Sequence, residues 1–263
     1  MIAVLRSEWL KLRTTSIPWL LTGIALVITG LFILLDFVNR GSGGPEHPGG
    51  FGPPTPDVPH TTQQLRDLLG SGVGIYVFAL LLGVLIITVE FRHKTVTTSF
   101  LTTPHRTRFV GGKLVLAALA GAVLAVIVLA ATVLGGGIAL SAKGGSFSAL
   151  LHQVGAVAPG MILVYALFAV LGVGVGSLLT NQVAAIVVSL GWFLILENII
   201  GGIWPGTVKW LPSGAALAAS NVSAGTREQI FLFTWWQGSL LILAYGLVFA
   251  AIGSLVLARR DIT

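Results

Sequence analysis

Six long apolar stretches constrain the fold of this chain more than any other feature of its sequence. Each is close to the ~20 residues that an α-helix needs to cross the hydrocarbon core of a bilayer. Only 9% of the residues are charged, and a soluble protein needs a far larger share to cover its surface. We therefore predict an all-α polytopic membrane protein with a single transmembrane domain over residues 1–263. The six predicted spans are residues 17–38, 72–89, 114–140, 154–179, 183–203 and 235–258.

Glycine and proline mark the least regular parts of the third and fourth spans. Gly135, Gly136 and Gly137 lie in the third and Pro159 in the fourth, so both helices are candidates for a break there. Small residues spaced four apart have a different meaning, because they let helices approach closely within a subunit or across a dimer. This spacing occurs around Gly121 in the third span and among Gly172, Gly174 and Gly176 in the fourth.

Residues 1–16 have the pattern of a helix that lies in the membrane interface. Leu5, Trp9 and Leu12 fall on one helical face, and most of the charged residues fall off it. Trp9 suits the headgroup level, where tryptophan is enriched. The alternative is a charged leader before a signal sequence. It is disfavoured because the next apolar run exceeds the usual core of about 7–15 residues and no A-x-A site follows.

Two segments are predicted to lie on the external side of the membrane, and their compositions differ from each other. Residues 39–71 contain a stretch dominated by glycine and proline and are predicted to form an external loop without a core of its own. Residues 204–234 are less polar than an ordinary loop, contain two prolines, and are bracketed by Trp204 and Trp210 at the start and by Trp235 and Trp236 just after the end. We predict that this second segment re-enters the outer leaflet and includes a short helix at residues 215–219.

Lysine and arginine are distributed unequally between the two sides. Ten of the 15 lie on the side that holds both termini and residues 90–113. Such a bias marks the cytoplasmic side of a membrane protein. We predict a multi-pass protein of the cell (plasma or inner) membrane with both termini in the cytoplasm. The formal net charge of +6 is explained by this orientation, so no nucleic-acid partner is predicted.

Residues 90–113 form a long basic segment between two apolar spans. They include five lysines and arginines against one acid, Glu90. Val96, Phe100 and Leu101 fall on one side of a short amphipathic helix that Pro104 is expected to end. Such a helix, held between two spans, suits docking to a cytosolic partner. Glu90 is then either a helix-end charge paired with a nearby basic residue or the hinge acid between this docking helix and the second span. The motif described below favours the hinge.

The sequence lacks the common signatures of an enzyme. It contains no cysteine, which excludes thiol catalysis and zinc–thiolate sites. Gly112 and Lys113 resemble the end of a phosphate-binding loop, but Thr107 and Leu114 stand where that motif requires glycine and Ser or Thr. The patterns G-x-S-x-G and H-E-x-x-H are absent. We predict a protein that is not itself an enzyme, with no catalytic or metal-binding residues and no directly bound cofactor.

Glu197 and Asn198 form a polar pair toward the outer end of the fifth span. An acid at this depth is costly unless it is paired or hydrated. The sequence favours an interfacial acid that reaches the outer headgroups. It leaves open a second interpretation, in which the pair is a polar point on a substrate path or gate.

Three motifs occur in a fixed order along the chain. Residues 7–15 (SEWLKLRTT) precede the first span, residues 89–108 follow the second, and ARRDIT closes the chain. The middle motif runs from Glu90 through Phe91 and Arg92 to Thr95, and it continues with a leucine, a proline and an arginine. With six spans, this order resembles the permease subunits of bacterial ABC exporters of the type-2 class, which are six-span half-transporters. Lys94 stands where that family usually has glycine, so the entry to the docking helix is expected to differ locally.

The resemblance implies a permease that pairs with a second copy or a paralogue. Each copy would sit on a separate ATP-binding cassette ATPase, which carries ATP and Mg. Spans one, two and five would line the path, with the segment after span five as an outer cap. The exported substrate would be amphipathic: a drug, as in multidrug resistance, an antibiotic peptide, a lipid or a glycolipid. The residues with the coupling and ATPase-docking role would be Glu90, Arg92, Lys94, Thr95, Val96, Phe100, Leu101, Pro104 and Arg106.

Two other functions fit the composition. One is a membrane scaffold or sensor that does not transport. The other is an intramembrane lipid-processing enzyme, against which the absence of a catalytic pair in the spans argues.

Overall fold

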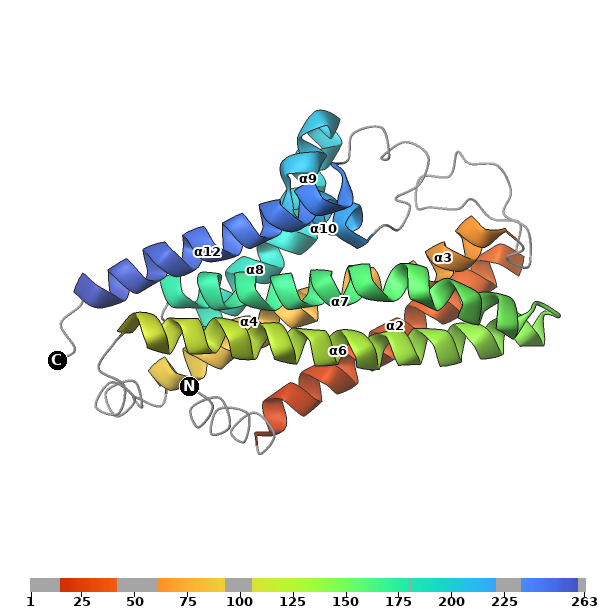
Figure 1. The fold of residues 1–263 in the computed structure, drawn as a ribbon, viewed down its shortest axis with the longest axis horizontal. Coiled ribbons are helices and arrows are strands. Elements are labelled where there is room, and N and C mark those ends of the chain that lie inside the picture. The colour runs from red at the N-terminus through yellow and green to blue at the C-terminus, as the bar shows by residue number, and fades with distance from the viewer. Residues whose placement is uncertain (1–14, 42–60, 93–105, 180, 221–232, 260–263) are drawn as a thin grey trace.

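The computed structural model describes residues 15–41, 61–92, 106–179, 181–220 and 233–259. Within these ranges every regular element is helical (Figure 1). Six helical stretches are long and apolar enough to cross a membrane, which confirms the prediction of an all-α chain with six such helices. These stretches are Ser16–Val38, Thr62–Val89, Gly111–Ala142, Phe147–Leu178, Gln182–Ile203 and Trp235–Leu255.

Several of these stretches are built from more than one element. The elements in chain order are α2 (Ser16–Gly41), α3 (Thr62–Gly70), the 3-10 helix η1 (Val73–Ile75), α4 (Tyr76–Arg92), α6 (Arg106–Ala142), α7 (Phe147–Leu178), α8 (Gln182–Gly191), the π-helix η2 (Trp192–Leu196), α9 (Glu197–Ile203), the 3-10 helix η3 (Pro205–Trp210), α10 (Pro212–Ser220) and α12 (Trp235–Arg259). The helix expected at residues 215–219 is therefore present as part of α10. The second membrane-crossing stretch combines α3, η1 and α4.

Helix α3 occupies the end of the region that we predicted as the external loop 39–71. It begins with a capping box in which the Thr61 side chain accepts from the Gln64 backbone N–H and the Gln64 side chain accepts from the Thr61 N–H. Leu65, Leu68 and Leu69 lie on its buried face. The helical spacing of these leucines and the Thr-x-x-Gln start both indicate a helix in the sequence. The glycine- and proline-rich stretch just before them led to the prediction of a loop instead.

The breaks considered for the third and fourth spans are absent. Helix α6 continues through the triple glycine at residues 135–137, and α7 continues through Pro159. The glycines instead make room for neighbours, because Gly136 faces the Leu68 side chain and Gly137 faces the Phe147 ring. Neighbouring helices around α7 support it where the missing Pro159 N–H would weaken an isolated helix.

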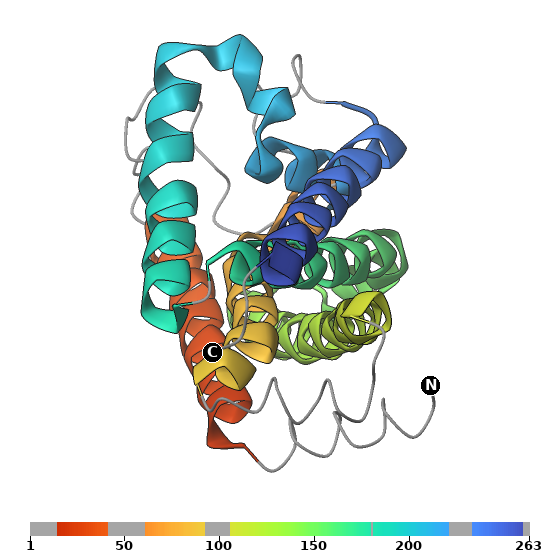
Figure 2. The same cartoon turned by 90° about the vertical axis from the view of Figure 1, so that its left-hand side faces the viewer.

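Helix α7 is the centre of the bundle, with α4, α6 and α12 packed around it (Figure 2). Its glycines permit backbone contact on more than one side. A Cβ atom at Gly172 would collide with the Leu80 carbonyl of α4, and one at Gly174 would crowd Gly246 of α12. On the facing helix α6, a Cβ at Gly121 would collide with the Tyr165 carbonyl. The small residues singled out in the sequence therefore serve packing inside the subunit.

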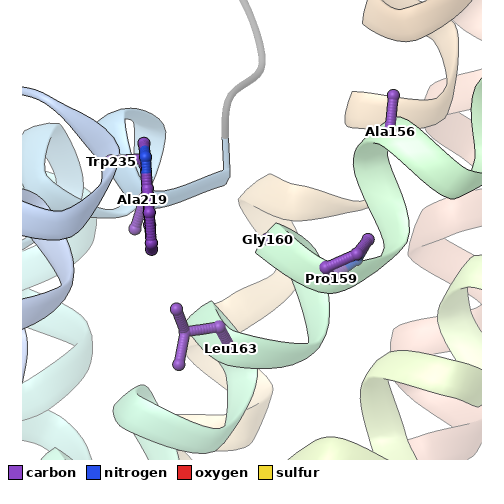
Figure 3. A pocket seen from close by; sticks show the side chains of 6 residues that line it. All are labelled: Ala156, Pro159, Gly160, Leu163, Ala219 and Trp235. Carbon is purple, nitrogen blue, oxygen red and sulfur yellow. The ribbon is translucent and has the colours of Figure 1, made fainter.

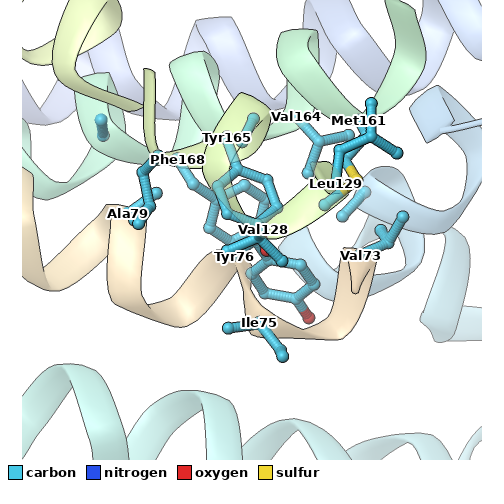
Figure 4. Packing of buried hydrophobic residues seen from close by; sticks show 14 of the residues in the cluster. Val73, Ile75, Tyr76, Ala79, Val128, Leu129, Met161, Val164, Tyr165 and Phe168 are labelled. Carbon is cyan, nitrogen blue, oxygen red and sulfur yellow. The ribbon is translucent and has the colours of Figure 1, made fainter. Parts of the chain in front are cut away.

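Aromatic side chains fill the middle of the bundle between α4 and α7 (Figure 4). The Tyr76 and Phe168 rings lie with centroids 4.1 Å apart. The fully buried Tyr165 donates its hydroxyl to the Gly72 carbonyl at 2.5 Å, between α3 and η1. This hydrogen bond satisfies a backbone acceptor at the junction where the second membrane-crossing stretch changes helix type.

The outer helices are covered on few sides. Helices α2, α12 and the α8–η2–α9 stretch expose most of their large apolar side chains, whereas α4 is almost wholly enclosed. Exposed apolar faces on helices of this length match a lipid environment or a neighbouring subunit.

Replacing Gly172 with alanine is expected to lower the stability of the protein by about 1–3 kcal/mol, because the new Cβ would press on the α4 backbone. The readout is the apparent melting temperature of the purified protein in mild detergent. Gly155→Ala is the matched control in the same helix, since nothing lies within 4 Å of its added Cβ. That change should be neutral or stabilise by up to about 1 kcal/mol. Equal shifts for the two variants would contradict the close packing.

Candidate functional site

Most of the predicted coupling residues lie outside the described residues. These are Lys94, Thr95, Val96, Phe100, Leu101 and Pro104, together with the predicted interfacial residues Leu5, Trp9 and Leu12. Glu90 and Arg92 lie in the last turn of α4, and Arg106 is the first residue of α6. The described ends of the basic segment are therefore helical extensions of the membrane-crossing helices on either side.

Glu197 points into the protein and is only 4% exposed. Its Oε1 accepts a hydrogen bond from the Trp192 indole Nε1 at 2.8 Å, and its Oε2 accepts from the Ser213 backbone N–H at 3.1 Å. The interpretation of Glu197 as an acid that reaches the outer headgroups is wrong, because both carboxylate oxygens are engaged inside the subunit. Within the described residues the carboxylate forms no ion pair, so its partners are neutral donors.

The Glu197 carboxylate caps the start of α10 from a different helix. Pro212 opens α10 and has no N–H, so the Ser213 N–H is the first donor that the helix presents. Leu211, which precedes it, has no side-chain acceptor to serve as an N-cap. A carboxylate at this position satisfies the amide and lies at the positive end of the helix dipole.

The π-helix η2 brings the two side chains of this site together. Trp192 begins η2, and Glu197 follows directly after its last residue, five positions along. In an α-helix, residues five apart point in different directions, whereas a widened π-turn brings them closer to one face. The indole of Trp192 can therefore reach back to the carboxylate of its own helix. Such π-turns occur frequently at functional sites.

The inward face of the same stretch continues toward α4 and α7. Ser189 and Glu197 are buried, and the half-buried Phe193 lies between them. The Phe193 ring is 5.5 Å from Phe168 and 6.2 Å from Tyr76, measured between centroids. The Ser189 hydroxyl is 3% exposed and has no hydrogen-bond partner. One polar group with donor capacity is therefore open on this face.

Asn198 does not share the buried face of Glu197. It is exposed, and its side-chain amide donates to the Leu194 carbonyl of the preceding turn at 3.0 Å. The predicted polar pair is thus divided between an interior group and a surface group.

A small apolar cavity of about 230 Å³ lies between α7, the end of α10 and the start of α12 (Figure 3). Pro159 on its wall has no N–H, which deprives the Gly155 carbonyl of its usual helical donor. The cavity offers shape and apolar contact but no charged side chain. Its lining residues are Ala156, Pro159, Gly160, Leu163, Ala219 and Trp235.

A search against family models finds no match to this chain, and a comparison with curated proteins finds none either. The function is therefore argued from the helices, the site around Glu197 and the motifs of the sequence.

Sequence reasoning missed the partners of Glu197. The start of α10 carries a usable signal, since proline followed by a run of small residues predicts a helix start and no capping residue precedes it. The pairing across sixteen positions has no local signal. The π-turn that orients Trp192 has none either, because the residues of η2 have the same apolar composition as the rest of the span.

Replacing Glu197 with alanine is expected to destabilise the protein by about 1–3 kcal/mol in all, because two part-buried donors, the indole N–H and the Ser213 N–H, lose their acceptor. Thermal unfolding in detergent gives the measurement. Asn198→Ala is the matched control one position along the same helix. It should stay within about 0.5 kcal/mol of the wild type, as expected for an exposed side chain. A Glu197→Ala protein as stable as Asn198→Ala would contradict the capping role.

Proposed function

We propose that this chain is the membrane-spanning permease subunit of an ATP-driven exporter. The observation that carries the proposal is the basic segment of residues 90–113, which joins the most enclosed of the membrane-crossing helices, α4, to the longest, α6. Its motif resembles the docking segment of type-2 ABC exporters. A cytosolic ATPase that binds ATP and Mg would dock there, because this chain lacks a complete phosphate-binding loop.

Helix α4 suits the transmission of force from this segment. Its last turn contains Glu90, and its other end carries Tyr76, 14 residues and about 21 Å away along the helix. Tyr76 packs against Phe168 of α7 and Phe193 of η2. A displacement at the docking segment would therefore reach the stretch that contains Glu197, because α4 is enclosed by neighbours and moves with its contacts.

The orientation proposed for the chain rests on charge. The end of α4, the start of α6 and the end of α12 gather at one end of the bundle, on the left in Figure 1. The first turn of α6 contains no acidic residue, and its basic residues suit the anionic surface of the cytoplasmic leaflet. We place this end, and both termini, in the cytoplasm of a cell whose plasma or inner membrane holds the protein.

The substrate proposed is an amphipathic small molecule, peptide or lipid. The inward face of the α8–η2–α9 stretch presents the Phe193 ring, which packs with Tyr76 and Phe168, and the open hydroxyl of Ser189. Such a lining suits a partly apolar molecule better than a hydrated ion. The exposed apolar faces of α2 and α8 would be covered by membrane lipid and by a second copy or paralogue of the permease.

Replacing Phe100 with aspartate is expected to release the ATPase from the permease, because a charge would enter the apolar side of the predicted docking helix. The test is a pull-down of the tagged permease from its native membrane in mild detergent, followed by an ATPase assay. Thr98→Asp is the control, since Thr98 falls on the other, threonine-rich side of the predicted helix and receives the same charge there. ATPase activity that survives Phe100→Asp would move the docking surface elsewhere. No ATPase in any sample would overturn the exporter and favour the scaffold or sensor.

Replacing Glu90 with alanine is expected to reduce transport by tenfold or more without reducing the amount of protein in the membrane, because the hinge acid acts in coupling. Efflux of a fluorescent amphipathic dye from cells, normalised to membrane-inserted protein, gives the measurement. Asp57→Ala in the glycine- and proline-rich segment removes an acid on the opposite side and should leave efflux unchanged. Normal efflux with Glu90→Ala would contradict the hinge role.

A further inference from the structure

The outer end of the bundle consists of two parts that are held together by few contacts. Helix α10 belongs to the central body, because it packs extensively on α12 and also on α7. Close backbone approaches hold it there: a Cβ at Gly238 of α12 would crowd the Ala215 carbonyl, and one at Gly160 of α7 would crowd Ser220. Trp210, just before α10, accepts the Tyr245 hydroxyl of α12 on its carbonyl at 2.8 Å.

The α8–η2–α9 stretch forms the second part, which we call the arm. The first helix of the arm, α8, packs on α4 and more lightly on α7. The last helix, α9, which we call the upper arm, has extensive contact only with its neighbours in the chain, η2 and η3, among the described residues. Most large side chains of the arm are exposed. The upper arm therefore lacks the interlocked packing that holds α10.

We propose that Glu197 is a latch that holds the upper arm to the central body and is released when the π-turn of η2 relaxes. The carboxylate belongs to the arm and caps α10, which belongs to the body. The Trp192 indole fixes the direction of the carboxylate from the start of the π-turn. One hydrogen bond, from the Ser213 N–H, thus joins a loosely packed helix to a tightly packed one, and a second, inside the arm, orients the carboxylate.

The π-turn supplies the means of release. If η2 takes α-helical geometry, every residue beyond it rotates by about 100° around the helix axis, the angle of one residue. Glu197 then leaves the start of α10, and the Trp192 indole loses its acceptor. The Ser213 N–H becomes available to water, and the upper arm can swing outward. A rotation of this size changes the state of the latch without breaking the helix.

Phe193 connects the latch to the rest of the molecule. It lies within η2, and its ring packs against Tyr76 of α4 and Phe168 of α7. A shift of α4 therefore acts directly on the π-turn. The purpose of the release, an opening of the outer end during export, rests on the proposed function. The two-position latch itself rests only on the contacts of Glu197.

The latch can be tested by distances between spin labels, because the chain contains no cysteine of its own. One label is placed on the arm at Ile199→Cys and one on the central body at Leu240→Cys, side chains that are 51% and 56% exposed. The labelled permease is reconstituted in nanodiscs of phosphatidylcholine and phosphatidylglycerol. Pulsed electron paramagnetic resonance then gives the distance distribution for the parent and for the Glu197→Ala, Trp192→Phe and Asn198→Ala variants.

The parent should show one narrow distance population. Glu197→Ala should raise the fraction at longer distance at least threefold, Trp192→Phe should fall between them, and Asn198→Ala should match the parent. Parent-like distributions for both Glu197→Ala and Trp192→Phe would overturn the latch. If Glu197→Ala does not purify as a folded protein, Trp192→Phe decides, since it keeps an aromatic ring and removes only the indole donor. The spin-label measurement uses the permease without an ATPase. Its failure would overturn the latch, whereas a failed pull-down would overturn the proposed exporter, so the two results can be told apart.

Discussion

Backbone-to-backbone contact along α7 is the constraint on which the rest of this structure depends. Apolar side chains gain little from leaving lipid for a protein interior, so helices in a membrane need close packing and satisfied polar groups to stay together. Gly172 and Gly174 supply that packing toward two different neighbours. The enclosed position of α4 follows from it. So does the position of Tyr165, whose buried hydroxyl donates to the open carbonyl of Gly72.

The same constraint explains why the bundle has a firm interior and a loosely attached arm. Helices with small residues facing α7 lie against it along much of their length, whereas the α8–η2–α9 stretch touches it lightly. The upper end of the arm lacks such packing, and the hydrogen bond between the Glu197 carboxylate and the Ser213 N–H joins it to the body. Breaking a hydrogen bond that holds a lightly packed helix changes the position of that helix with little repacking of the core.

Hydropathy predicts the number and approximate position of the membrane-crossing helices because each must be apolar over a fixed length. The spacing of small residues also predicted close packing, although not which neighbour each glycine meets. The direction of Glu197 was beyond such reasoning, since it depends on a π-turn without a distinctive composition and on an amide sixteen residues later. The capping box of α3 was available at Thr61 and Gln64, and it was overlooked because composition outweighed local pattern.

The length of the α6–α7 hairpin has a consequence for the lipid around the protein. The apolar part of each helix comprises 32 residues, about 48 Å of helix against a hydrocarbon core of about 30 Å. Such a mismatch is accommodated by tilting or by local thickening of the bilayer. Since α7 is the axis on which the other helices pack, a change of its inclination is shared by the whole bundle. We therefore expect the thickness of the bilayer to change the inclination of the bundle, independently of any partner bound at its ends.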